Sequence, residues 1–89
     1  MAESRTYEVR LLVTARRQLL RVPVRIRSRI AGAIRALAAD PRPPGCKKLA
    51  GSTDYFRIRV GDYRVLYEVR DRDVLVLVIK IGHRRDVYR

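Results

Sequence analysis

The amino-acid sequence predicts a small α+β domain in which a pair of helices packs on a mainly antiparallel, twisted β-sheet. Apolar and charged residues alternate along 7–13 and 55–69, which is typical of half-buried strands, whereas apolar residues recur at helical spacing along 23–39. The resulting order, β-α-α-β-β-β, puts the helices before a run of strands, as in α+β folds. A chain of 89 residues has room for one such domain, spanning 1–89, with a single small core.

The N-terminal half is expected to supply one strand and both helices. The stretch Tyr7–Val13 predicts the strand, and Thr14 is a candidate N-cap for a short helix that ends near Arg21. Pro23 suits the first position of a second helix, because its missing N–H needs no partner there, and this helix is expected to end near Ala39. Its apolar stripe comprises Ile26, Ile30, Ala33, Ile34 and Leu37, and the arginines off the stripe are Arg25, Arg29 and Arg35.

The C-terminal half is expected to contain a stiff loop followed by the remaining strands. The loop is DPRPPG, Asp40–Gly45, and a short extended piece, KKLAG, comes after it. Beyond the hairpin segment, the turn Asp71–Asp73 leads into a last strand, Val74–Ile81, which is apolar on both faces. A strand of this kind is expected in the centre of the sheet, covered on at least one side.

The hairpin segment YFRIRVGDYRVLYEV, 55–69, predicts its own register. Gly61 and Asp62 form the two-residue turn, which sets Arg59 directly opposite Arg64. One face then carries Phe56, Ile58, Val60, Tyr63, Val65 and Tyr67, and the other carries Arg57, Arg59 and Arg64 among Tyr55, Leu66 and Glu68. Like charges directly opposite each other destabilise paired strands. The arginine face, expected to be open to water, is therefore either simply solvated or a binding surface for an anion.

The charge of the chain points to an anionic partner. The formal net charge is +12, and the basic residues are 18 Arg and 3 Lys. A folded domain this basic indicates a polyanion such as nucleic acid, and the preference for Arg favours planar, bidentate contacts to phosphate. An acidic protein satisfies the same charge, so both kinds of partner stay open at this point.

The residues available for chemistry exclude most hydrolytic mechanisms. Glu68, Asp71 and Asp73 form the only tight group of acids, and arginines are interleaved with them, so neither a metal site nor a cofactor is expected. The sequence has no Cys and His spacing for zinc, no glycine-rich phosphate loop and no Ser-His-Asp set. The arginines, lysines, tyrosines and His83 that remain suit the stabilisation of charge on a phosphate.

The expected location is the cytoplasm, with no membrane partner. The N-terminal stretch MAESRTYEVR contains no apolar segment of a signal peptide, and the longest apolar run, VLVLVIKI, is too short to cross a bilayer as a helix. Cys46 is the single cysteine, so it has no partner for an internal disulfide and is expected to be an inert thiol.

The order β-α-α-β-β-β, the segment KKLAGSTDYFRIRVGDYRVLYEV and the ending VIKIGHRRDVYR resemble the RelE family of bacterial toxins, within the RelE/ParE superfamily. The similarity runs from Tyr7 to Arg89. It implies a RelE-like fold and a toxin that cuts mRNA in the ribosomal A site without a metal, using the mRNA's own 2′-hydroxyl as nucleophile. It also implies a cognate antitoxin, expected to be acidic and to wrap the toxin, and contact with operator DNA only through the toxin–antitoxin complex.

The resemblance assigns roles to five residues. The family's basic pair falls on Arg57 and Arg59, its next arginine on Arg64, its late arginine on Arg84 and its near-terminal tyrosine on Tyr88. Three of these are the residues that the hairpin register places together on one face.

One departure from the family concerns proton transfer. The basic pair is lysine in the best-known member, whereas here it is arginine, which is a poor general acid. His83, whose ordinary pKa suits proton transfer, and Tyr88 are the candidates for this duty. Lys47, Lys48 and Arg85 are expected to bind the RNA backbone.

Two other functions stay open. A ParE-like inhibitor of DNA gyrase shares the fold and an arginine-rich tail but needs no RNA-cleaving face; Arg57, Arg59 and Tyr88 argue against it. A non-catalytic module that binds nucleic acid or an acidic protein also accounts for the charge.

Overall fold

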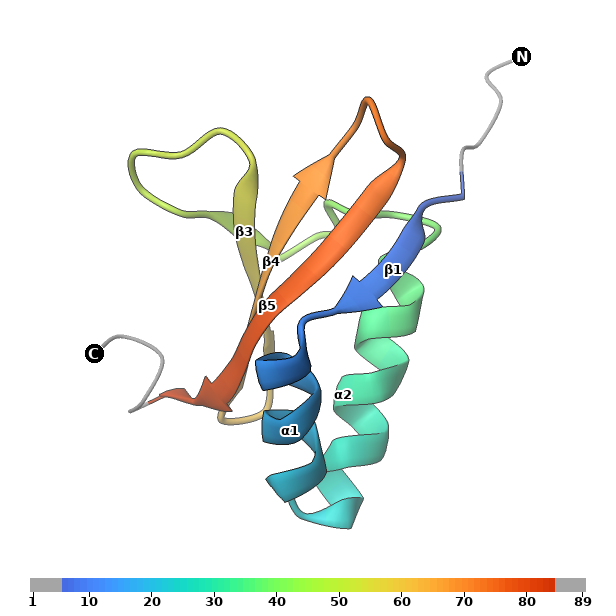
Figure 1. Ribbon diagram of the computed structural model, residues 1–89. Coiled ribbons are helices and arrows are strands. Elements are labelled where there is room, and N and C mark those ends of the chain that lie inside the picture. The colour runs from blue at the N-terminus through green and yellow to red at the C-terminus, as the bar shows by residue number, and fades with distance from the viewer. Residues whose placement is uncertain (1–5, 85–89) are drawn as a thin grey trace.

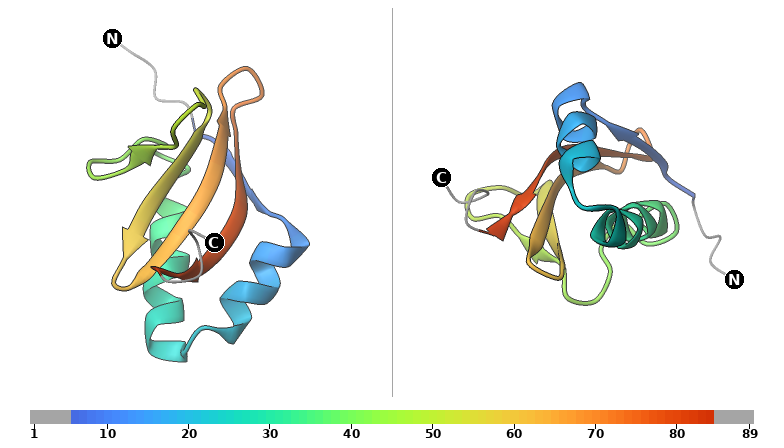
Figure 2. Two further views of the ribbon diagram at one scale, coloured as in Figure 1. Left: turned by 90° about the vertical axis from the view of Figure 1, so that its left-hand side faces the viewer. Right: turned by 90° about the horizontal axis from the view of Figure 1, so that it is seen from below.

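The protein, in a computed structural model that describes residues 6–84, is a two-layer α+β domain. Its elements are β1 (Glu8–Leu11), α1 (Val13–Arg21), α2 (Val24–Ala36), β2 (Lys47–Lys48), β3 (Tyr55–Val60), β4 (Tyr63–Arg70) and β5 (Leu75–His83). The strands form one twisted sheet in the order β1-β5-β4-β3-β2, and both helices lie on one side of it (Figures 1 and 2). β1 runs parallel to β5, and the other neighbours are antiparallel. The predicted fold class is confirmed.

The first helix begins earlier than the sequence predicts. α1 starts at Val13, and the prediction that Thr14 caps it is wrong, because Thr14 lies inside the helix. The reason is the strand before it. The N–H of Leu12 still donates to the carbonyl of Val78 on β5, at 2.9 Å, so the chain turns into the helix directly after Leu12. Leu12 offers no side-chain cap.

The second helix is displaced slightly at both ends. Pro23 is the N-cap rather than the first helical residue, and its carbonyl accepts hydrogen bonds from the N–H groups of Ile26 and Arg27. The helix ends at Ala36 instead of near Ala39, because the following residues tighten into a turn with hydrogen bonds three residues back. The predicted stripe is correct, since Ile30, Ile34 and Leu37 are buried and Ile26 and Ala33 pack against the core.

The hairpin has the register that its turn predicts. Gly61 adopts a φ of +60°, and Arg59 pairs with Arg64 across the turn. The apolar side chains of β3 and β4 point toward the helices and form most of the core together with β5; the buried ones on these strands are Phe56, Ile58, Val60, Val65, Tyr67, Val69, Val76, Val78 and Ile81. The hydroxyl of the fully buried Tyr67 donates to the carbonyl of Pro41 at 2.7 Å, which anchors the loop after α2.

The last strand lies inside the sheet, between β1 and β4, and is covered by the helices on one side, as predicted. Its pairing with β4 contains one irregularity. Tyr67 pairs with Val78 but Leu66 pairs with Lys80, so Ile79 is an extra residue and forms a β-bulge. β1 pairs with β5 only as far as Val78.

A polar network surrounds Asp71 in the β4–β5 turn, at the other end of β4 from the Gly61–Asp62 turn. The hydroxyl of Tyr7 donates to Oδ1 of Asp71 at 2.6 Å, and Arg42 donates to both carboxylate oxygens of Asp71 at 2.8 and 3.3 Å. The hydrogen bond to Asp71 is the main reason that the pKa values of Tyr7 and Arg42 are both raised. Arg42 also lies 5.1 Å from the ring centroid of Phe56, so the network joins the N-terminal strand, the loop after α2 and the β4–β5 turn.

Neither helix in residues 6–84 has the length and apolar character needed to cross a membrane.

Candidate functional site

Cationic side chains gather on the sheet face turned away from the helices, toward the end that holds the Gly61–Asp62 turn. Strand alternation places them there, because their neighbours in sequence point into the core. The residues of this surface, the cationic face, are Lys47 on β2, Arg57 and Arg59 on β3, Arg64 on β4, Lys80 on β5 and Arg84 directly after β5. The prediction that the hairpin collects positive charge on one face is correct.

The charge on this side of the sheet is divided unevenly. On the same side of the sheet, two residues beyond Leu66 on β4, Glu68 pairs with Arg70 at 3.1 Å, and on β1 Glu8 pairs with Arg10. At the cationic face, no strand position within residues 6–84 contributes a carboxylate, and the acid that acts on Arg64 is Asp62 in the turn. The positive charge is therefore concentrated instead of balanced.

Arg64 is buried, which corrects the expectation that the whole arginine face is open to water. The residue is only 7% exposed. β4 is the central strand of the sheet, so neighbouring strands flank Arg64 on both sides. Arg59 lies opposite it on β3, and Gly82 lies opposite it on β5. Strand order is a tertiary property, and for this reason the hairpin sequence alone gave no sign of the burial.

The guanidinium of Arg64 lacks a compensating partner. Its Nη1 donates to its neighbour's carbonyl, at Tyr63, over a long 3.4 Å, and its Nε is the one buried side-chain polar atom within residues 6–84 with no hydrogen-bond partner. Burial lowers the pKa of Arg64, and the charges of Arg59, Arg57 and Arg84 lower it further. Arginine nevertheless stays protonated in proteins. Arg64 is thus a buried cation that a bound anion would stabilise.

The other predicted residues divide between this face and elsewhere. Arg57 and Arg59 lie on it, and the backbone N–H of Arg84 donates to the carbonyl of Asp62 at 2.7 Å, which holds Arg84 against the turn. Tyr88 and Arg85 lie outside the described residues, so their roles stay predictions.

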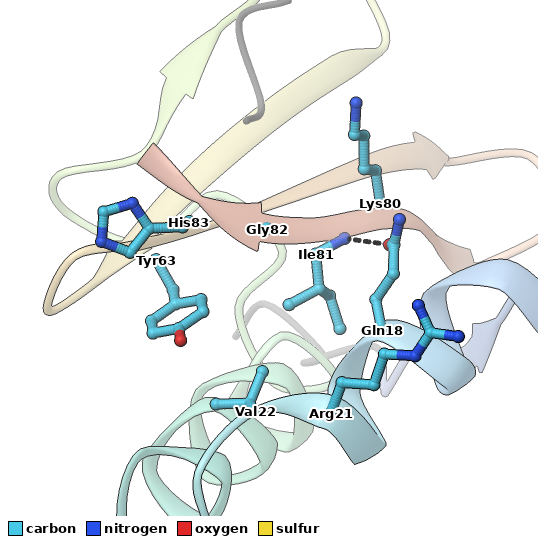
Figure 3. A pocket seen from close by; sticks show the side chains of 8 residues that line it. All are labelled: Gln18, Arg21, Val22, Tyr63, Lys80, Ile81, Gly82 and His83. Carbon is cyan, nitrogen blue, oxygen red and sulfur yellow. Dashed lines mark hydrogen bonds between the residues drawn. The ribbon is translucent and has the colours of Figure 1, made fainter. Parts of the chain in front are cut away.

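His83 lies on the other side of the sheet from Arg64. It pairs with Tyr63, whose neighbours on the same face are buried against the helices, and the two rings meet edge to face at 5.5 Å and 82°. Both line a cleft of about 260 Å³ that Gln18 and Arg21 of α1 complete (Figure 3). The structure therefore places His83 on the opposite side of the sheet from Arg57, Arg59 and Arg64, and its part in proton transfer stays a prediction.

The positions of the lysines differ from those expected of RNA-binding residues at one predicted residue, Lys48, and add one residue, Lys80. Lys47 pairs with Arg57 and joins the cationic face, whereas Lys48 pairs with Phe56 and falls on the opposite side of its strand. Lys80 belongs to the cationic face, although sequence reasoning missed it. Figure 3 shows its side chain pointing away from α1, on the opposite side of β5 from Gln18. In a strictly alternating strand Lys80 would point into the core. Its position on the cationic face therefore depends on the bulge, which the sequence does not show.

The arrangement suits electrostatic stabilisation of a phosphate. A buried guanidinium without a carboxylate partner, surrounded by further cations, is a preorganised set of donors for an oxyanion whose charge increases during a reaction. Within residues 6–84 no group of three or more His, Cys, Asp or Glu side chains is placed to hold a metal ion.

Comparison with known proteins identifies similar chains. A family model described as the ParE toxin of the type II toxin–antitoxin system parDE matches residues 9–88. Toxin RelG of Mycobacterium tuberculosis is 37% identical over 87 residues, covering 93% of this chain and 97% of RelG. Among solved structures, the toxin–antitoxin complex RelBE2 from M. tuberculosis contains a chain of 32% identity, with a TM-score of 0.79 and coverage of 97% and 100%. The archaeal RelE–RelB complex from Pyrococcus horikoshii contains one of 29% identity, with a TM-score of 0.81 and coverage of 92% and 99%.

Proposed function

The chain belongs to the RelE/ParE family of toxins of type II toxin–antitoxin systems, and on that premise we propose that it is a ribosome-dependent mRNA endoribonuclease. The observation that carries the proposal is Arg64, a buried guanidinium without a compensating partner at the centre of a cationic face. A gyrase inhibitor or a passive binding module has no need for such a group. A phosphoryl-transfer enzyme does, because negative charge grows on the phosphate in the transition state.

In the proposed reaction the mRNA supplies its own nucleophile. The 2′-hydroxyl attacks the adjacent phosphate, and the bond to the 5′-oxygen breaks, giving a cyclic phosphate and a free 5′-hydroxyl. Arg64 and Arg59 donate hydrogen bonds to the non-bridging oxygens, whose charge increases during the attack. Because arginines hold their protons, a different group moves the proton. Tyr88 and His83 are the predicted candidates, of which His83 lies on the other side of the sheet from Arg64.

The partners follow from the charge and the relatives. Similar toxins have been solved in complex with RelB antitoxins. We propose that this toxin likewise binds a cognate antitoxin, and that the antitoxin is acidic, because the chain carries a net charge of +12. The ribosome and mRNA are the remaining proposed partners, operator DNA is contacted only through the antitoxin complex, and the site of action is the cytoplasm.

The test is brief expression in a bacterium, with the 5′ ends of cellular mRNA mapped before and after induction. The expected result is new cleavage within translated reading frames. Arg64→Ala should abolish most of it, since loss of one preorganised donor costs about 10²–10³ in rate. Arg25→Met is the charge-matched control, because Arg25 is exposed on α2, in the helical layer. Growth arrest with intact mRNA and DNA-damage signalling would instead indicate a gyrase inhibitor, and no arrest together with no cleavage would indicate a binding module.

A further inference from the structure

The strand residues of the cationic face lie in two rows that cross the sheet side by side. The first row runs from Arg59 through Arg64 to Gly82, and the second comprises Lys47, Arg57, Leu66 and Lys80 in register. On each strand the rows are two residues apart, which is about 6.6–6.8 Å and on the scale of one nucleotide step. The first row holds the buried guanidinium of the proposed reaction centre. The second has cations at both ends of an apolar residue.

A β-bulge places Lys80 in the second row. Before the bulge, Val76 and Val78 point into the core; after it, Ile81 does. With regular pairing, Lys80 would lie opposite Val65 and point into that core. The extra residue Ile79 shifts the alternation, so that Lys80 lies opposite Leu66 on the cationic face. Bulges commonly redirect a side chain next to a functional site.

The neighbours of Lys80 leave it available for an anion. Leu66 separates it from Arg57, and two strand spacings, about 9.6 Å, lie between their backbones. Both side chains are long enough to extend over the shorter Leu66 toward each other. No carboxylate of residues 6–84 stands in this row, and the side chain of Lys80 points away from the helical layer (Figure 3).

We propose that Lys80 is a substrate-binding residue that, together with Arg57, holds the backbone phosphate next to the one bound at Arg64. The proposal rests on the proposed function for its substrate, single-stranded RNA, and adds a contact that orients the strand. A phosphate that does not react keeps the same charge throughout the reaction. Lys80 is therefore expected to strengthen binding of the ground state and the transition state equally, which alters KM and leaves kcat unchanged.

The first experiment measures binding without cleavage. A short single-stranded RNA with 2′-O-methyl groups, which cannot supply the attacking hydroxyl, is titrated with wild type, Lys80→Met, Lys80→Arg and the control Arg25→Met over a range of salt concentrations. Lys80→Met is expected to bind several-fold more weakly and to lower the slope of log K against log salt by about 0.7, the value for one lost contact to a single strand. Lys80→Arg and Arg25→Met are expected to keep the wild-type slope.

Replacing single phosphates locates the contact. In a series of the same RNA with one neutral methylphosphonate linkage each, Lys80→Met and wild type should bind equally when the neutral linkage is the one at Lys80. All other linkages should preserve the several-fold difference. A difference that is the same for every linkage would overturn the assignment to one phosphate.

Cleavage on mRNA-programmed ribosomes separates this proposal from the proposed function. Lys80→Met should raise KM several-fold at unchanged kcat, whereas Arg64→Ala should lower kcat. If wild type cleaves and Lys80→Met cleaves with the same KM, the role of Lys80 is overturned and the nuclease assignment stands. If wild type binds RNA with a Lys80-dependent slope but never cleaves, the nuclease assignment fails and the contact stands. An absence of RNA binding by wild type would overturn the proposal for Lys80.

Discussion

Arg59 and Arg64 lie directly opposite each other across the β3–β4 hairpin, with no carboxylate beside them on the strands of the described chain. Such a pair opposes folding, because like charges repel and Arg64 is also buried. The fold must therefore be stable enough to tolerate an arrangement that favours binding of an anion. This tension between stability and binding can be measured.

Replacing the buried guanidinium of Arg64 should stabilise the protein and should also inactivate it. Arg64→Met keeps much of the side-chain volume and removes the uncompensated guanidinium, so the free energy of unfolding should rise by about 1–2 kcal/mol. Cleavage on programmed ribosomes should fall by about 10²–10³. Urea unfolding measures the first effect, with Arg25→Met as the control that should change neither. A less stable Arg64→Met would show that the guanidinium contributes to the fold.

Inorganic anions should stabilise the wild-type fold through the same site. Sulfate is expected to raise the Tm more than sodium chloride of equal ionic strength, because an ion that binds only the folded state stabilises it. Sulfate also stabilises proteins generally. The informative quantity is therefore the difference between wild type and Arg64→Met, which should show the smaller rise. Equal rises in both would contradict binding at Arg64.

The hydrogen bond of Tyr67 should affect stability without affecting the cationic face. Tyr67→Phe leaves the carbonyl of Pro41 without its donor in a buried position, which should cost about 1–2 kcal/mol. Tyr55→Phe is the matched control, since Tyr55 is exposed and should lose almost nothing. Urea unfolding gives both values. RNA cleavage by Tyr67→Phe should match wild type at temperatures where both are folded, and a large loss there would mean that the loop after α2 takes part in function.

The Tyr7–Asp71 hydrogen bond should make stability depend on alkaline pH. The pKa of Tyr7 is raised in the folded protein, chiefly because its hydroxyl donates to Asp71. The neutral form is thus favoured by folding. The stabilisation is fully present below the unfolded pKa of about 10 and is lost as the pH rises through the higher folded value. The difference in unfolding free energy between wild type and Tyr7→Phe should therefore shrink above that pH. A constant difference from pH 7 to 11 would contradict the role of this hydrogen bond.

Local sequence was sufficient to predict the turn and the register of the β3–β4 hairpin. Gly61 and Asp62 define a two-residue turn, and the register with Arg59 opposite Arg64 follows from the turn geometry alone. The burial of Arg64 depends on strand order, which a hairpin sequence does not contain. The prediction that Thr14 is the N-cap was wrong for a similar reason, because pairing between the first and last strands decides where α1 begins.

The cationic face was predictable only in part. Its hairpin residues follow from alternation, and Lys47 was expected to bind RNA. Lys80 was missed because a single extra residue changes which side of the strand it occupies, and nothing in VLVLVIKI marks that residue. His83 was expected to be a candidate for proton transfer, but its pairing with Tyr63 places it on the helical side of the sheet.

The bulge at Ile79 also bears on how the length of β5 can change during evolution. The bulge reverses the alternation of sides along β5, since every later residue of the strand takes the side that regular pairing would assign to its neighbour. Deleting Ile79 would remove the bulge without exchanging the two faces, because Lys80 would then follow Val78 directly and still point outward, with Ile81 still pointing into the core. The two faces would be exchanged only if the present sequence paired regularly, so a relative that is one residue shorter at this point is expected to keep the same inward and outward residues.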